Sequence, residues 1–184
     1  VALKGETEAI SNLFGLVRNP RFRNFVDAYR ETGMLRLFFN SILLTGLAAT
    51  GNTVLAALAA FPISRGLVFG HKVLYRVMTM GIFLPPGIIP LYAVMAGLGL
   101  ARTYAGFAIM GSGMHLTIGI FILVSFARNI PRSLDEAAYV EGCGYGRYFL
   151  AFVLPLMKPS LVTVWLLRAL QLWNDFLYPF VFLR

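Results

Sequence analysis

The chain has little of what soluble domains and most enzymes use. Of its 184 residues, 13% are charged, whereas soluble domains carry roughly a quarter. The single cysteine, Cys143, excludes an intrachain disulfide, and the two isolated histidines provide neither a catalytic pair nor a zinc motif such as H-E-x-x-H. Hydrophobic residues make up 58% of the chain, and the mean hydropathy is +0.73. This composition indicates a membrane protein without a metal site.

A compact basic surface is also missing, although the net charge is +8. The cations are spread out and lie mostly between apolar runs, where the positive-inside rule places them. We therefore expect contact with lipid and not with nucleic acid. No signal peptide is visible, the first residue is valine, and the last residues fall within an apolar run. These features predict a fragment of a longer chain.

Four apolar runs are long enough to cross a membrane. Residues 37–64, 77–101 and 103–127 carry no charge, and a fourth run, 159–183, is interrupted only by Arg168 and Asp175. At about 1.5 Å per residue, each run exceeds the roughly 30 Å of hydrocarbon. Helices satisfy their own backbone in lipid, and no alternating barrel pattern occurs. The sequence predicts an all-α, polytopic membrane helix bundle.

Two of these runs contain more than apolar residues. In the first run, small or short polar residues recur at every fourth position, at Ala48, Asn52, Ala56 and Ala60. Such a face lets another helix approach closely, so it predicts a bundle. The second run contains the sequence LPPGIIP, whose prolines remove helical hydrogen bonds. We expect this helix to be kinked or interrupted, either for packing or along a pathway.

The segment before the first run, residues 1–36, is amphipathic. Within it, apolar side chains fall on one helical face, at Phe22, Phe25, Val26 and Tyr29. We expect a surface helix that lies on the membrane or caps the bundle.

The loop charges predict an orientation. The connections 64–76 and 128–158 together carry seven cations, whereas the connection between them carries only Arg102. Positive loops face the cytoplasm. Residues 1–36 would then be external, and residues 37–184 would form a transmembrane domain with a cytoplasmic loop at 128–158.

This loop contains glycines at alternate positions, in the sequence GCGYG. The spacing matches neither a dinucleotide fingerprint, G-x-G-x-x-G, nor a phosphate loop, G-x-x-x-x-G-K-[ST]. It predicts instead a helix that Ser133 and Glu136 cap at its start and that a left-handed Gly142 ends. An interfacial helix is expected to follow up to Pro155. Its aromatic face would contain Tyr145, Tyr148, Phe149 and Phe152.

These residues carry a resemblance to a known family. The pattern E-A-A, three residues, G, nine residues, an apolar residue, any residue, L-P is similar to the cytoplasmic signature of ABC importer permeases. Here it consists of Glu136, Ala137, Ala138, Gly142, Phe152, Leu154 and Pro155. The sequences NFVDAY, FFNSI, IIPLYAVMAGLGLARTYAG and LQLWNDFLYPF also resemble the carbohydrate-importer permeases, the smaller permease of the maltose transporter among them. The resemblance covers about residues 20–183, with mild departures at Arg102, Glu141, Cys143 and Phe152.

The resemblance implies the membrane-spanning subunit of a binding-protein-dependent importer in a prokaryotic inner membrane, with about four of the six usual spans present. It implies a sugar substrate, a second and different permease subunit, and an external solute-binding protein. The loop helix would dock on a cytoplasmic ABC ATPase dimer, which binds ATP and Mg²⁺, whereas this chain would bind no cofactor. The docking residues would be Glu136, Ala137, Ala138, Gly142, Leu154 and Pro155.

The fourth run holds candidates for the pathway or for contacts between helices. An arginine in the middle of a span is costly unless it faces a partner or water, which singles out Arg168. Asp175 lies seven residues later and could pair with it. Trp173 and Asn174 belong to the same family-like stretch.

Three other functions stay open at this point. The chain could be an ABC permease for a solute other than a sugar. It could be an ion-coupled secondary transporter, which would use embedded acids, but no acid occurs between residues 37 and 127. It could be an intramembrane enzyme, which would need a nucleophile and a base that we do not find. The sequence favours a transport subunit that is not itself an enzyme.

Overall fold

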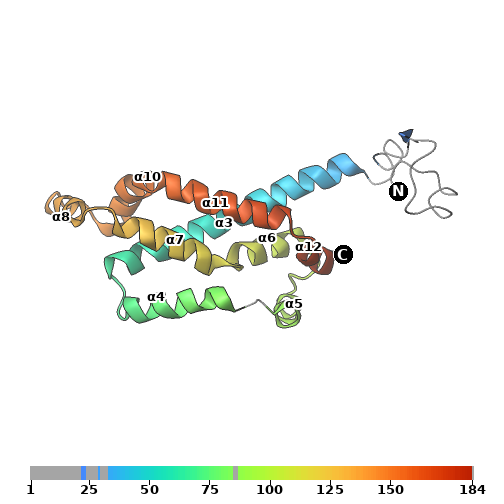
Figure 1. The fold of residues 1–184 in the computed structure, drawn as a ribbon, viewed down its shortest axis with the longest axis horizontal. Coiled ribbons are helices and arrows are strands. Elements are labelled where there is room, and N and C mark those ends of the chain that lie inside the picture. The colour runs from blue at the N-terminus through green and yellow to red at the C-terminus, as the bar shows by residue number, and fades with distance from the viewer. Residues whose placement is uncertain (1–21, 24–28, 30–32, 85–86, 184) are drawn as a thin grey trace, which may run out of the picture. The chain divides into compact units, whose positions relative to one another are not determined.

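The computed structural model describes residues 22–23, 29, 33–84 and 87–183, and every regular element in this part is a helix (Figure 1). The chain divides into two compact units, Val1–Leu43 and Leu44–Arg184. Most of the predicted surface helix in the first unit lies outside the described residues. Gly33, with a φ of +59°, precedes α3 (Met34–Arg65), and its carbonyl accepts the backbone N–H of Arg36 at 2.9 Å.

Together with α3, the remaining helices provide up to four candidate membrane spans. They are, in chain order, α4 (His71–Met80), the 3-10 turn η1 (Gly81–Phe83), α5 (Ile88–Gly97), α6 (Tyr104–Gly113), α7 (Leu116–Arg128), α8 (Arg132–Val140), α9 (Tyr145–Tyr148), the π-helical η2 (Phe149–Val153), α10 (Leu154–Leu156), α11 (Lys158–Trp173) and α12 (Leu177–Phe182). By length and apolar character, α3 can cross a membrane alone. Three bent pairs can each do so together: α4 with α5, α6 with α7, and α9–α10 with α11. The all-α fold class is confirmed.

The predicted packing face of α3 is confirmed. Its four small or polar residues are at most 1% exposed. They face glycines on α6 and α7: a Cβ added at Gly111 would lie 2.8 Å from the Cβ of Ala48, and one added at Gly119 would lie 3.0 Å from that of Ala56. These helices approach so closely that the facing positions require glycine.

Two predicted spans are interrupted. The second run ends at Phe83 and resumes at Ile88, as its prolines predicted. The third run, predicted as one helix, instead breaks between α6 and α7, which meet at 45°. The break lies at His115, which has a left-handed backbone with a φ of +56°.

The prediction for the fourth run holds at its start but not at its end. The interfacial helix ends at Leu156, one residue past Pro155, and then turns by 75° into α11, which begins at Lys158. At the other end, α11 stops at Trp173, and α12 is a separate helix.

Apolar clusters hold the second unit together at its two ends, and α8 lies at one of them (Figure 1). The larger cluster joins α3, α7 and the helices from α9 to α11, with Leu123, Val153 and Met157 fully buried. The smaller cluster joins α5, α6 and α12 through residues such as Phe107 and Phe182. The larger cluster therefore supports the end of the unit that carries α8.

Candidate functional site

The predicted loop helix exists as α8, but its start differs from the prediction. α8 begins at Arg132, and Pro131 occupies the N-cap position without a side-chain cap. Ser133 therefore lies inside the first turn, where its hydroxyl is not the capping group, and the predicted cap is wrong. The reason is that Pro131, with φ −57° and ψ 137°, already directs the chain into the helix two residues earlier.

The end of α8 follows the prediction. Gly142 has a φ of +73°, the left-handed conformation that glycine adopts without a steric penalty. Its N–H donates to the Tyr139 carbonyl at 3.0 Å, and the N–H of Cys143 donates to the Ala138 carbonyl at 2.8 Å. These two bonds form a Schellman motif, which closes the helix and turns the chain sharply.

The segment after this corner packs differently from the predicted aromatic face. Tyr148, Phe149 and Val153 are buried, whereas Tyr145 and Phe152 are largely exposed. The π-helical η2 causes this difference, because its wider turn shifts the residues that face the bundle. The ring of Phe61 on α3 lies 5.0 Å from that of Phe149 and 6.1 Å from that of Tyr148, measured between centroids.

An ion pair joins α8 to the end of α3. Arg65 Nε lies 3.1 Å from Asp135 Oδ2, with the two side chains 6% and 28% exposed, and Arg65 Nη1 donates to the Ile130 carbonyl at 3.1 Å. The Tyr148 hydroxyl donates to Asp135 Oδ1. Sequence reasoning missed this contact, because Arg65 and Asp135 are far apart in the chain and no local motif links them.

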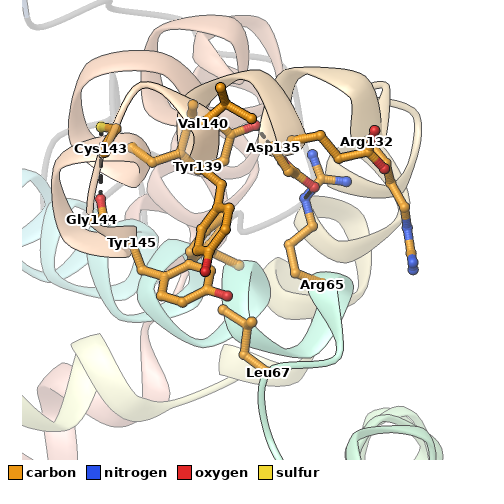
Figure 2. Close-up of a pocket in the computed structure, with 14 residues that line it drawn as sticks. Arg65, Leu67, Arg132, Asp135, Tyr139, Val140, Cys143, Gly144 and Tyr145 are labelled. Atoms are coloured by element: carbon orange, nitrogen blue, oxygen red, sulfur yellow. Dashed lines mark hydrogen bonds and ion pairs between the residues drawn. The ribbon is translucent and has the colours of Figure 1, made fainter.

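A cavity of about 680 Å³ lies beside α8, the glycine corner and the end of α3 (Figure 2). Figure 2 shows Arg65 reaching from α3 towards Asp135 on α8. Tyr139 and Val140, at the far end of α8, are 78% and 84% exposed. Large apolar side chains this exposed beside a cavity are typical of a surface that a partner covers.

The predicted docking residues occupy different environments on this surface. Glu136, Ala137 and Gly142 are exposed. Ala138 and Leu154 are half-buried against the larger apolar cluster, and Pro155 is exposed within α10. The structure thus places the E-A-A residues on α8 and Gly142 just after its end, while Leu154 packs against the larger apolar cluster.

A second polar site lies in the bundle, at the break between α6 and α7. Arg168 on α11 is only 6% exposed. Its Nη2 donates to the Gly111 carbonyl at 2.8 Å. Its Nη1 lies 2.8 Å from Gln171 Oε1 and 3.3 Å from His115 Nδ1. From the other side, Asn52 on α3 donates to the carbonyls of Ser112 and Met114 at 2.9 and 3.0 Å. The two side chains therefore satisfy carbonyls that the end of α6 leaves free. The sequence predicts a packing role for Asn52, but no local pattern indicates this hydrogen bonding.

The other predicted pathway residues lie at the end of α11. The pairing of Arg168 with Asp175 is not formed in the described structure, because Asp175 lies beyond the helix and caps α12: its Oδ1 accepts the N–H groups of Leu177 and Tyr178 at 3.1 and 3.2 Å. Asn174 Nδ2 donates to the Leu170 carbonyl at 2.8 Å and so closes α11. Trp173, the last residue of α11, is 48% exposed.

No group of three or more His, Cys, Asp or Glu side chains in the described ranges could hold a metal ion.

Residues 13–182 match the family model described as binding-protein-dependent transport system inner membrane component. The chain belongs to this family, the membrane-spanning permeases of ABC importers, which are transport subunits and not enzymes. It is accordingly an inner-membrane protein, as the sequence predicted.

Relatives in this family include proteins named for the uptake of sugars. The chain is 31% identical over 180 residues to the diacetylchitobiose uptake system permease NgcG of Streptomyces coelicolor, covering 97% of this chain and 60% of the relative. It is 28% identical over 166 residues to the melibiose/raffinose/stachyose import permease MelC of Bacillus subtilis, covering 89% and 60%. It is also 29% identical over 162 residues to the osmoprotective compounds uptake permease GgtD of Synechocystis, covering 87% and 54%. The chain thus spans 60% or less of the length of these three relatives.

The fold also has a solved counterpart. A crystal structure of a bacterial ABC transporter involved in the import of the acidic polysaccharide alginate contains a chain that is 23% identical, with a TM-score of 0.75. The match covers 100% of this chain and 65% of that chain. This likeness confirms the permease fold.

Proposed function

We propose that this chain is part of the membrane permease of an ATP-driven, binding-protein-dependent importer, and that α8 with its Gly142 corner is the element on which a cytoplasmic ATPase acts. The observation that carries the proposal is the exposed surface of α8, where Glu136, Ala137 and the apolar pair Tyr139 and Val140 face outward. A polar and apolar surface of this kind suits a docked protein better than open water.

The anchoring of α8 supports a mechanical role. The Schellman motif fixes one end of the helix, and the Arg65–Asp135 ion pair fixes its first turns to α3. A helix held at two places transmits a displacement to the bundle, whereas a flexible loop would absorb it. ATP-driven closure of an ATPase dimer can then bias the bundle between inward-facing and outward-facing states, provided that the partners bind these states differently.

The proposed importer contains three further components besides this chain: the ATPase, a second permease and a solute-binding protein. ATP and Mg²⁺ act at the ATPase, and a second permease, different from this chain, completes the pathway. An extracytoplasmic solute-binding protein delivers the substrate. For the substrate we favour a sugar, because NgcG and MelC are named for oligosaccharides. The relative GgtD, named for osmoprotective compounds, keeps a different solute as the second candidate.

The test is binding-protein-stimulated ATP hydrolysis by the complete transporter in liposomes. Glu136→Lys reverses one charge on the exposed face of α8 and should abolish the stimulation, while the permease still inserts and purifies. Arg147→Glu, a charge reversal of the same size but opposite sign at an exposed site outside α8, is the control. Normal stimulation in Glu136→Lys would refute docking through α8, and solute uptake driven by an ion gradient without ATP would refute the importer.

Cross-linking gives a second test of the same surface. Cys143 is only half exposed and packs against the larger cluster, so Val140→Cys, at a position 84% exposed, is the better probe. It should cross-link to cysteines introduced in the cleft of the ATPase. Leu150→Cys, at a position 64% exposed on the following helix, should not. Equal cross-linking of both positions would contradict the proposed contact.

A further inference from the structure

Cationic side chains gather at a second cavity near the same end of the bundle. This cavity, of about 590 Å³, lies where α3 ends, α4 begins, α7 ends and α8 begins. Besides Ser64 and Tyr75, all the described residues that line it are basic: Arg65, His71, Lys72, Arg76, Arg128 and Arg132. No acidic side chain lines this cavity within the described residues, and Asp135, which pairs with Arg65 from outside the lining, balances only one of the charges.

Two of the arginines are held in place at this cavity. Arg128 lies over the ring of Tyr75, with Cζ 4.7 Å from the ring centroid. The Arg65 side chain is only 6% exposed, and its Nη2 has no hydrogen-bond partner. Nε also lacks a hydrogen bond but lies in the ion pair with Asp135, and Nη1 donates to the Ile130 carbonyl. A buried guanidinium nitrogen without an acceptor is costly and rare, which indicates an acceptor supplied from outside the chain.

The two remaining cations on α4 repeat one turn apart. Lys72 and Arg76 are both exposed and lie at positions i and i+4 of the same helix, where like charges repel. An anion bound in the cavity would relieve this repulsion and that among the arginines. Phosphate oxygens suit such a site, because arginine forms paired hydrogen bonds to them.

Exposed apolar residues border the cations. The turn before α4 carries Leu67, Val68 and Phe69, of which Phe69 is fully exposed, and Val73 and Val77 of α4 are 62% and 60% exposed. A folded chain does not leave such a row in water, and aromatic residues next to cations are typical of the membrane interface. A basic pocket between membrane helices with an apolar row beside it matches the two parts of a phospholipid.

We propose that this cavity binds the phosphodiester headgroup of an anionic membrane phospholipid, whose acyl chains lie along the exposed apolar side of α4. The proposal uses the membrane location of the chain and its predicted cytoplasmic side, where anionic lipids are bound by basic pockets. It does not use the docking of α8 on an ATPase. An acidic surface of a partner protein is the competing ligand, but it would leave the apolar row of α4 uncovered.

The test compares lipid binding to two double variants of the complete purified transporter by native mass spectrometry. Lys72→Gln/Arg76→Gln removes two exposed cations of the cavity without touching the Arg128–Tyr75 contact, so the fold is preserved. Arg147→Gln/Lys158→Gln removes two cations elsewhere in the same predicted cytoplasmic loops. Each cation near a membrane surface accounts for about a fivefold change in affinity. Phosphatidylglycerol should therefore bind roughly 25-fold more weakly to the first variant and with unchanged affinity to the second.

The other outcomes overturn the proposal. Equal loss in both variants would mean general charge attraction, and equal binding of phosphatidylcholine would remove the role of the anionic headgroup. If inorganic phosphate displaced phosphatidylglycerol when present at the same concentration as the lipid, the cavity would be a site for a free anion instead. Loss of the ATPase subunit from Lys72→Gln/Arg76→Gln, with lipid binding unchanged, would identify a protein-docking surface. Because the readout is lipid occupancy, failure of the docking test at Glu136 leaves this result unaffected.

Discussion

Replacing Gly142 by alanine isolates the backbone cost of the corner that ends α8. The residue has a φ of +73°, and no atom lies within 4 Å of the position that a Cβ would occupy. Alanine would therefore meet no neighbour, and its whole penalty would be the left-handed conformation itself, about 1–2 kcal/mol. If the chain left that conformation, the hydrogen bonds from the N–H groups of Gly142 and Cys143 would be lost as well.

The magnitude predicts a measurable effect on coupling. A loss of about 1–2 kcal/mol shifts the balance between the native corner and rearranged corners by about 5- to 30-fold. We assume that α8 docks on the ATPase only when this corner is formed. In the Gly142→Ala variant, the ATPase concentration required for half-maximal stimulated hydrolysis should then be up to about 5- to 30-fold higher. Titration of the ATPase subunit against permease in liposomes measures it.

Two further variants test whether the left-handed conformation of residue 142 causes the effect. Gly142→Asn should have a smaller effect than alanine, because asparagine adopts the left-handed region more readily. Gly144→Ala should have none, because Gly144 has a φ of −67° and the space around its Cβ position is also empty. Equal behaviour of Gly142→Ala and Gly144→Ala would show that the left-handed corner does not matter for coupling.

Further predictions concern the buried polar contacts of α3. Asp135→Ala leaves the Arg65 guanidinium without its carboxylate and should lower the free energy of unfolding by about 1.5–3 kcal/mol; the double variant Arg65→Met/Asp135→Leu should recover part of this loss in thermal melts, because the unpaired charge is gone while the Tyr148 hydroxyl and the Ile130 carbonyl still lack their partners, and no recovery would contradict a direct pair. Asn52→Leu leaves the carbonyls of Ser112 and Met114 without donors and should destabilise the permease by about 1–3 kcal/mol per carbonyl. Asn52→Asp should do the same because it removes the donating amide, and a melting temperature unchanged in both variants would show that water replaces the amide.

Features that depend on nearby residues could be predicted from the sequence. The apolar runs, the small face of α3 and the glycine that ends α8 each follow from side chains within a few turns of one another. The interruption after Phe83 followed from prolines, which act on their own helix. The E-A-A pattern is likewise local, and it identified the family correctly.

Features that depend on distant contacts could not be predicted. The break at His115 has no proline, and the carbonyls near it are satisfied by Asn52 and Arg168, which lie on two other helices. Asp175 was matched to Arg168 by helical spacing, but that spacing applies only if the helix continues, and α11 ends at Trp173. Ser133 fitted a capping box, yet the preceding proline started α8 earlier. Distant helices therefore decide the geometry at His115, whereas at Ser133 and Asp175 a nearby residue overrides the pattern that the sequence suggested.

The contacts of α3 suggest how the two polar sites are connected in the proposed function. Asn52 binds the break between α6 and α7, and Arg65 binds α8, so one continuous helix holds both sites, roughly 20 Å apart at 1.5 Å per residue. Because Arg65 is buried and paired, a displacement of α8 either moves α3 or breaks the ion pair. Moving α3 would in turn shift the donors that hold the break. The Arg65→Met/Asp135→Leu variant separates these alternatives. If α3 transmits the displacement, this variant should keep ATPase binding while transport per ATP hydrolysed falls, whereas unchanged transport would mean that the larger apolar cluster alone carries the coupling.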